Sequence, residues 1–184
     1  MFQTLKNAWK IPELKNKLLF TLLIIVLYRL GSALYLPWIN PEALEAWFNQ
    51  MGGNALGWLN LLSGGALSRA TLFALSVSPY ITASIVIQLL TIAIPVFERW
   101  SKEGESGRKK LSAITRVVTV VLALVTAIGY TMYISSLNSG AMMTDAGKTF
   151  FGKVVLVGCY CAGAALIMWL AEQINEFGIG NGIS

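Results

Sequence analysis

The sequence predicts an all-α membrane protein: a polytopic helical bundle with four transmembrane helices, an N-terminal interfacial helix and a short half-helix. Hydrophobic residues make up 55% of the 184 residues and charged residues only 12%, about half the charged share of a typical soluble domain. The charged residues are also segregated, and they leave uncharged runs at 70–97, 117–144 and 154–171. At about 1.5 Å per residue, a helix over each run would be close to or longer than the roughly 30 Å thickness of a bilayer core.

The chain begins with a predicted cytoplasmic amphipathic segment over residues 1–17. Apolar and basic side chains occupy different helical faces there, as in a helix that lies in the membrane interface. The apolar ones are Phe2, Leu5 and Trp9, and the basic ones are Lys6 and Lys10. The first span is expected over 18–38, interrupted only by Arg29. Because the apolar stretch continues past Arg29 and further spans follow, we expect a retained anchor helix rather than a cleaved signal peptide.

The second span, expected over 71–97, is irregular. Pro79 falls inside it and disfavours helical geometry at Ser78. The stretch from Tyr80 to Ile94 gives about 22 Å of helix, too short to cross the bilayer core. The residues upstream must complete the crossing, and they include Asn60, Ser63, Gly64, Gly65, Ser68 and Arg69. Since such residues survive at membrane depth only against protein or water, we predict a broken helix with a short polar piece. An ordinary proline-kinked helix with an external loop is the alternative.

Two stiff apolar residues, Val77 and Ile81, stand four apart at this break. Side chains of this kind beside a cavity can form a constriction that excludes water. Two apolar residues at helical spacing are also what ordinary packing produces, and the spacing alone leaves both interpretations open.

The remaining elements are more regular. A cytoplasmic loop is expected over 98–110, the third span over 111–135, the fourth over 151–171, and a cytoplasmic turn over 172–184. A stripe of small residues in the fourth span is suited to close helix contact. The stripe consists of Gly158, Ala162 and Ala165.

The distribution of Lys and Arg predicts the orientation. Basic residues gather before the first span and in the connection between the second and third. They are Lys6, Lys10, Lys15 and Lys17, then Arg99, Lys102, Arg108, Lys109, Lys110 and Arg116. The connections on the other side carry Arg69, Lys148 and Lys153. The N-terminus and the 98–116 connection are therefore predicted to be cytoplasmic. The net charge of +5 does not by itself indicate a nucleic-acid partner, because anionic lipid or a cytoplasmic partner would attract the same basic residues.

No catalytic residue, metal site or cofactor is predicted. The sequence contains no His, which removes Ser–His pairs and histidine metal sites. Its two cysteines, Cys159 and Cys161, lie in an apolar run and are expected to be buried structural thiols.

Three stretches closely resemble the SecY family, the channel subunit of the bacterial protein-export translocase. Asn60–Leu90 resembles that family's plug and second transmembrane helix, and Lys102–Arg108 its first cytoplasmic loop. Leu166–Asn175 with Gly178–Ser184 is similar to the end of helix four and the turn into helix five. The resemblance is weakest over 36–58 and 136–152. It implies that the chain covers helices one to four of a ten-helix channel.

The resemblance also implies roles for particular residues. Residues 59–70 would be the plug that closes the external funnel, and its named members are Asn60, Leu61, Leu62, Ser63, Gly64, Gly65, Ala66, Leu67, Ser68 and Arg69. Val77 and Ile81 would belong to the apolar pore ring. Thr82, Gln88 and Thr119 would lie on the lateral gate between the two halves of the channel.

The function that the resemblance implies is passive transport of polypeptides. Unfolded secretory chains would cross the cytoplasmic membrane, and membrane segments would leave laterally into it. The implied partners are the SecE and SecG subunits, the SecA motor ATPase or a translating ribosome, signal peptides and nascent chains, and membrane lipids. No direct nucleic-acid binding is expected, apart from ribosome contact. A secondary transporter with a discontinuous helix is the alternative, although no Asp or Glu lies within any span to couple an ion. A lipid-modifying enzyme is a further alternative. It would need His, Asp or Cys near the membrane interface, and the sequence contains no His.

Overall fold

The computed structural model describes residues 11–50, 55–137 and 142–182, and this part of the chain is built of helices. They are α2 (Pro12–Gly31), α3 (Pro41–Gln50), α4 (Ala55–Leu62), α5 (Ser78–Ala93), α6 (Pro95–Lys102), α7 (Glu105–Ser136), α8 (Asp145–Lys148) and α9 (Phe150–Phe177). The prediction of an all-α fold is confirmed. Most of the predicted N-terminal interfacial segment, including Phe2, Leu5 and Trp9, lies outside the described residues.

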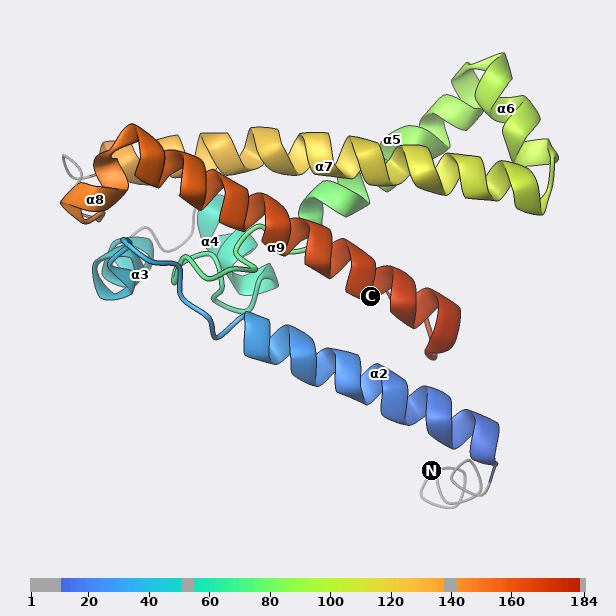
Figure 1. The fold of residues 1–184 in the computed structure, drawn as a ribbon, viewed down its shortest axis with the longest axis horizontal. Helices are drawn as coiled ribbons and strands as arrows, with labels where there is room; N and C mark the ends of the chain where they lie inside the picture. Colours follow the sequence, from blue (N-terminus) through green and yellow to red (C-terminus); the bar gives the residue numbers. More distant parts are fainter. Residues whose placement is uncertain (1–10, 51–54, 138–141, 183–184) are drawn as a thin grey trace.

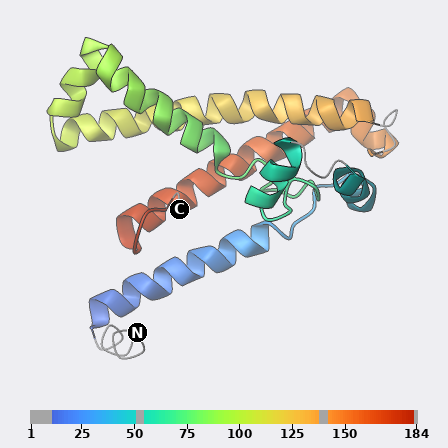
Figure 2. The same cartoon turned by 180° about the vertical axis from the view of Figure 1, so that it is seen from behind.

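The long helices form an open, splayed bundle (Figure 1). α7 packs along α9, α5 packs on α7, and α2 contacts α9. The short helices α3 and α8 gather at one end of the bundle, while α6 lies at the opposite end beside the start of α7 (Figures 1 and 2). The bundle therefore has an end built from connecting segments and an end built from the α6–α7 hairpin.

Two helices of the described part, α7 and α9, are each long and apolar enough to cross a membrane. A third crossing is available if α5 and α6, which meet at 100°, count as one span. The first predicted span is not among these helices, because α2 carries Glu13, Lys15 and Lys17 in its first two turns and Arg29 in its last. The fold is thus that of a polytopic helical membrane protein, although the four expected spans are not equally regular.

The helix expected over 18–38 ends at Gly31. Gly31 lies against the ring of Phe73, and a Cβ at this position would overlap that ring unless Phe73 moved. The following residues then leave the helical path and pair with other connections. Tyr35 forms an antiparallel bridge with Thr71, and Ile39 forms one with Met143. Tertiary pairing therefore replaces the last two turns of the predicted span.

The helix expected over 71–97 differs at both ends. α5 begins only at Ser78, so Pro79 lies in its first turn, where the missing N–H costs no helical hydrogen bond. Pro79 therefore helps to start a helix rather than kinking one. At the other end Ile94 is extended (φ −113°, ψ 120°) because Pro95 follows it. This second break sends α6 away at 100° to α5.

The cytoplasmic loop expected over 98–110 is mostly helical. α6 continues to Lys102 and α7 begins at Glu105, so only Glu103 and Gly104 connect them. Gly104 adopts φ 74°, a conformation that glycine accepts most easily. Exposed ion pairs, including Lys110 with Glu103 at 3.0 Å, add little stability but fit a solvated end of the bundle. Similarly, α9 extends past the expected end of the fourth span to Phe177.

The apolar core lies at the end of the bundle that holds α3 and α8. Its residues come from the two connections in which the family resemblance is weakest, from the segment before α5 and from the ends of α7 and α9. They are Leu36, Ile39, Leu44, Phe48, Leu67, Ala70, Ala74, Ala127, Ile134, Met142, Met143, Leu156 and Tyr160. Backbone bonds tie the two connections together, with Asn40 N donating to Met142 O at 3.0 Å and Thr144 N to Trp38 O at 2.9 Å. This end is a packed cap rather than a set of loose loops.

Candidate functional site

The residues before α5 form a compact non-helical unit, which we call the turn segment (residues 63–77). The half-helix that precedes it is α4, Ala55–Leu62, so the short helix ends before most of the residues 59–70 predicted as a plug. Gly64 and Gly65 have φ angles of 65° and 84°, which let the chain reverse immediately after α4. This polar stretch is therefore a chain reversal followed by turns, and not the half-helix that the sequence predicted.

Asn60 closes the turn segment on itself. Its side-chain oxygen accepts a hydrogen bond from Ser68 N at 2.9 Å, and its backbone oxygen accepts one from Gly65 N at 2.9 Å. Ser63 Oγ then accepts a bond from Leu67 N at 3.2 Å. Ser63 and Ser68 are only 7% and 3% exposed, so these bonds satisfy polar groups that water cannot reach. The polar residues that mark the segment in the sequence are what allow its irregular backbone to be buried.

The substitution Asn60→Ala is expected to loosen the turn segment, because it leaves the buried Ser68 N–H without its acceptor at a cost of about 1–3 kcal/mol. Hydrogen–deuterium exchange over residues 63–72 should become at least fivefold faster, as about 1 kcal/mol implies. Asn175→Ala is the matched control, since Asn175 accepts a similar bond from Gly182 N at the other end of the bundle. Equal exchange over 63–72 in both variants would contradict this role of Asn60.

Three helices hold the turn segment in place. Phe73 stacks on Tyr28 of α2 with ring centroids 5.6 Å apart. In α9, Gly163 lies so close to the backbone carbonyl of Leu72 that no Cβ could be accommodated there. From α7, Tyr130 donates its hydroxyl proton to Leu67 O at 2.6 Å. The small residue needed for close approach is thus Gly163, whereas Gly158, which the predicted stripe contained, faces open space.

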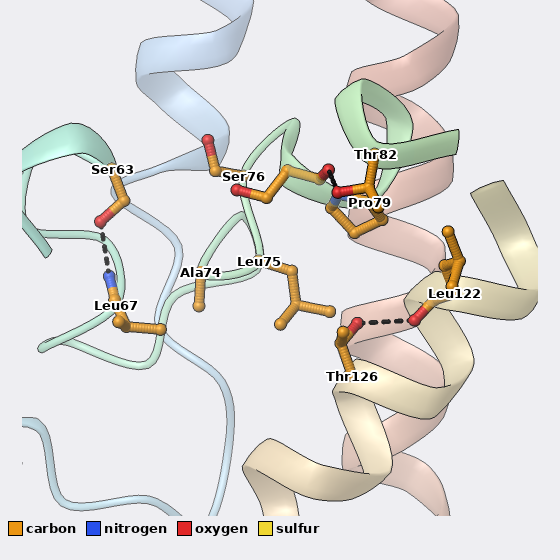
Figure 3. Close-up of a pocket in the computed structure, with 10 residues that line it drawn as sticks. Ser63, Leu67, Ala74, Leu75, Ser76, Pro79, Thr82, Leu122 and Thr126 are labelled. Carbon is orange, nitrogen blue, oxygen red and sulfur yellow. Dashed lines mark hydrogen bonds between the residues drawn. The ribbon is translucent and has the colours of Figure 1, made fainter. Parts of the chain in front are cut away.

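A pocket of about 220 Å³ lies between the turn segment, the start of α5 and the middle of α7 (Figure 3). Its wall is mostly apolar with several hydroxyl groups. The lining residues are Ser63, Leu67, Ala74, Leu75, Ser76, Ser78, Pro79, Thr82, Leu122 and Thr126. The Thr82 and Thr126 hydroxyls donate to the backbone carbonyls of Ser78 and Leu122, at 3.0 Å and 2.8 Å. The pocket therefore offers a surface without fixed charge and with few free donors.

The predicted ring residues lie next to this pocket. Val77 precedes α5, and its carbonyl accepts bonds from Tyr80 N and Ile81 N, both at 3.0 Å. Val77 and Ile81 are thus neighbours in the first turn, and both are half-buried. Neither is among the residues that line the pocket. Their role in a pore ring remains a prediction.

The three predicted gate residues occupy different environments. Thr82 is exposed and lines the pocket. Gln88 is exposed and donates to Ser84 Oγ at 3.4 Å. Thr119 is only 1% exposed, and its hydroxyl donates to Thr115 O within α7 at 2.7 Å. The structure does not bring these residues together on one surface, and their assignment to a gate also remains a prediction.

Two features of the site were absent from the sequence-based predictions. Tyr130 contacts the turn segment across 63 residues of sequence, and no local pattern marks such a contact. Arg69, expected only as a plug residue, pairs with Glu45 of α3 at 3.3 Å with both side chains partly exposed. The pairing links the turn segment to the cap at the same end of the bundle.

These observations define a class of membrane protein in which a polar, non-helical segment is packed among helices at the start of a span. The sequence model of the SecY family matches residues 71–184. The chain is 43% identical over 185 residues to the protein translocase subunit SecY of Bacillus licheniformis, covering all of this chain and 42% of that protein. It is 48% identical over 174 residues to the SecY subunit of Pseudomonas aeruginosa, covering 95% and 38%. This chain belongs to the SecY family.

Solved structures show the same fold. The Sec61 channel of the canine ribosome–channel complex from the endoplasmic reticulum matches with a TM-score of 0.59 at 18% identity, over 92% of this chain and 34% of that one. A protein-conducting channel matches with a TM-score of 0.58 at 19% identity, over 92% and 34%. The chain spans about two fifths of the length of its curated relatives. Those relatives are named as protein translocase subunits.

Proposed function

We propose that this chain forms the first part of a protein-conducting channel. Unfolded secretory polypeptides pass through the complete channel, and membrane segments leave it sideways into the lipid. The observation that carries the proposal is the turn segment, a polar stretch buried among α2, α7 and α9 beside a pocket, in a chain of the SecY family. Such a segment can close a polar path at membrane depth without exposing its backbone to lipid.

The transport step in this proposal involves no chemistry by the chain itself. The turn segment acts as the plug, and Val77 and Ile81 contribute to an apolar ring that excludes water when no polypeptide is present. A partner supplies the driving force. A signal peptide opens the path between α5 and the second half of the channel, where Thr82 and Gln88 are exposed. Thr119 would join this gate only if α7 moved, because it is buried here.

The complete assembly contains further components. The second half of the channel and the SecE and SecG subunits close the remaining walls, since α2, α5 and α7 leave broad apolar surfaces exposed. Examples are Leu22, Leu23, Ile25, Leu89, Ile92, Val121 and Val125. SecA or a translating ribosome docks on the basic end formed by α6 and the start of α7. The membrane is the bacterial cytoplasmic membrane.

The proposed orientation places the α6–α7 connection in the cytoplasm and α8 outside. A membrane-impermeant thiol reagent added to intact cells should label a cysteine at Asp145 but not one at Glu105, in a background with Cys159→Ala and Cys161→Ala. Both positions are suitable because their side chains are 98% and 86% exposed. Labelling at 105 and protection at 145 would reverse the proposed topology.

Translocation by the complete protein tests the proposed function. The full channel with its small subunits, reconstituted into vesicles with the motor ATPase, should import an unfolded secretory polypeptide into a protease-protected lumen. Residues 1–184 alone should not, because they supply only part of the wall. Import by the fragment alone would contradict the proposed assembly, and failure of the complete protein would contradict the proposed function.

A further inference from the structure

The hydroxyl of Tyr130 is the one side-chain group of α7 that hydrogen-bonds to the turn segment within the described residues. It donates to Leu67 O at 2.6 Å, and the same carbonyl accepts a second bond from Ala70 N at 3.2 Å. A carbonyl oxygen has two lone pairs, and both are used here. Leu67 is 8% exposed, so the contact lies in a region that water hardly reaches.

The ring of Tyr130 is fixed from the other side by α9. It meets the ring of Tyr160 edge to face, with centroids 5.3 Å apart. One turn before Tyr130 on α7, Thr126 lines the pocket together with Ser63 and Leu67 of the turn segment. The contact is therefore part of a continuous surface where α7 meets the turn segment.

The other contacts of the turn segment lie nearer its C-terminal end. Phe73 meets α2, and Leu72 meets Gly163 of α9. Over residues 63–68, the only hydrogen bonds that reach outside the turn segment, among the described residues, go to Asn60, Leu61 and Tyr130. Asn60 and Leu61 belong to the adjoining α4. Among the described residues, Tyr130 therefore makes the one hydrogen bond between this glycine-containing part and a long helix.

α7 is a single helix of 32 residues, from Glu105 beside the α6 hairpin to Ser136 in the cap. A helix of this length spans about 48 Å. A rigid-body shift of α7 would therefore move Tyr130 relative to Leu67. The hydrogen bond between them would weaken steeply once its geometry is lost.

We propose that Tyr130 is a positioning residue that latches the turn segment to α7, so that movement of α7 releases the segment. The proposal rests on the proposed function in treating the turn segment as a plug. It adds that the hydroxyl of Tyr130 is the group through which α7 controls whether the turn segment stays in its closed position.

Tyr130→Phe tests the latch, because it removes the hydroxyl and keeps the ring. The reporter is Ser68→Cys, a nearly isosteric change at a position 3% exposed in the closed form, in a background with Cys159→Ala and Cys161→Ala. In the complete reconstituted channel, Tyr130→Phe should increase the thiol labelling rate at position 68 about fivefold, as expected from losing one net hydrogen bond. The same variant should pass a substrate with a weakened signal peptide more readily than the parent does.

Tyr160→Phe is the matched control. Its hydroxyl is also buried, and it has no hydrogen-bond partner among the described residues, so its removal should leave the labelling rate at position 68 unchanged. Equal labelling rates for Tyr130→Phe and the parent, in channels that still translocate, would overturn the latch and leave the channel function intact. Equal acceleration by both variants would show a general loosening of the tyrosine pair, and it would overturn the latch as well.

Discussion

Gly163→Ala is expected to destabilise the protein, because it adds a methyl group where α9 packs tightly against the turn segment. The new Cβ would overlap the backbone carbonyl of Leu72, and a backbone carbonyl cannot move aside as a flexible side chain can. Overpacking of this kind costs about 1–3 kcal/mol. For a chain of this size, that corresponds to a fall of about 2–12 °C in Tm. Thermal unfolding of the purified protein in detergent measures it.

Gly158→Ala provides the comparison on the same helix. A Cβ at Gly158 meets open space, and alanine is a better helix former than glycine by about 1 kcal/mol. Its Tm should therefore be unchanged or slightly higher. If Gly163→Ala were tolerated as well as Gly158→Ala, the turn segment would not be packed against α9 as the structure has it.

Replacing Val77 and Ile81 together by Ser is expected to make the closed channel leak. In a pore ring these side chains exclude water, and their loss should raise the resting ion conductance about tenfold without unfolding the protein. Deleting Ser63–Ser68 should add to the leak, because the turn segment would no longer close the path. Conductance of the complete channel in planar bilayers measures the effect.

The competing explanation for Val77 and Ile81 is ordinary packing, and it predicts a different result. In that case the double substitution leaves cavities that cost about 1–4 kcal/mol and lowers the folded yield while the channel stays tight. Val86→Ser is the control, since Val86 lies on the same helix and is 40% exposed. Stable and tight channels with Ser at both positions would contradict the ring assignment.

The sequence predicts the long helices well because their signal is local. The uncharged run 117–144 overlaps α7 over residues 117–136, and the run 154–171 lies within α9. Pro79 was expected to break a helix, and it does stand where α5 meets the turn segment. Its place in the first turn of α5, rather than within a span, could not be inferred. A proline can stand in the first turn of a helix or inside a span, and the sequence alone does not distinguish the two positions.

The cap and the contacts of the turn segment could not be predicted, since they join residues far apart in the chain. The connections around Leu44 and Met142 are where the family resemblance is weakest, yet both residues are buried in the apolar core. The choice of Gly163 over Gly158 for close approach depends on the rotation of α9 about its axis. When a helix is apolar on every face, its sequence does not show which face packs inward, so it gives no indication of that rotation.

Photo-crosslinking during translocation tests the central claim most directly, namely that polypeptides pass where the turn segment, α5 and α7 meet. A photoreactive residue replacing Thr126, which lines the pocket, should crosslink to a secretory polypeptide arrested halfway through the complete channel. The same residue at Val154 of α9, 52% exposed outside the pocket, should crosslink to lipid instead. Crosslinks to the arrested polypeptide from position 154 and none from position 126 would contradict the account.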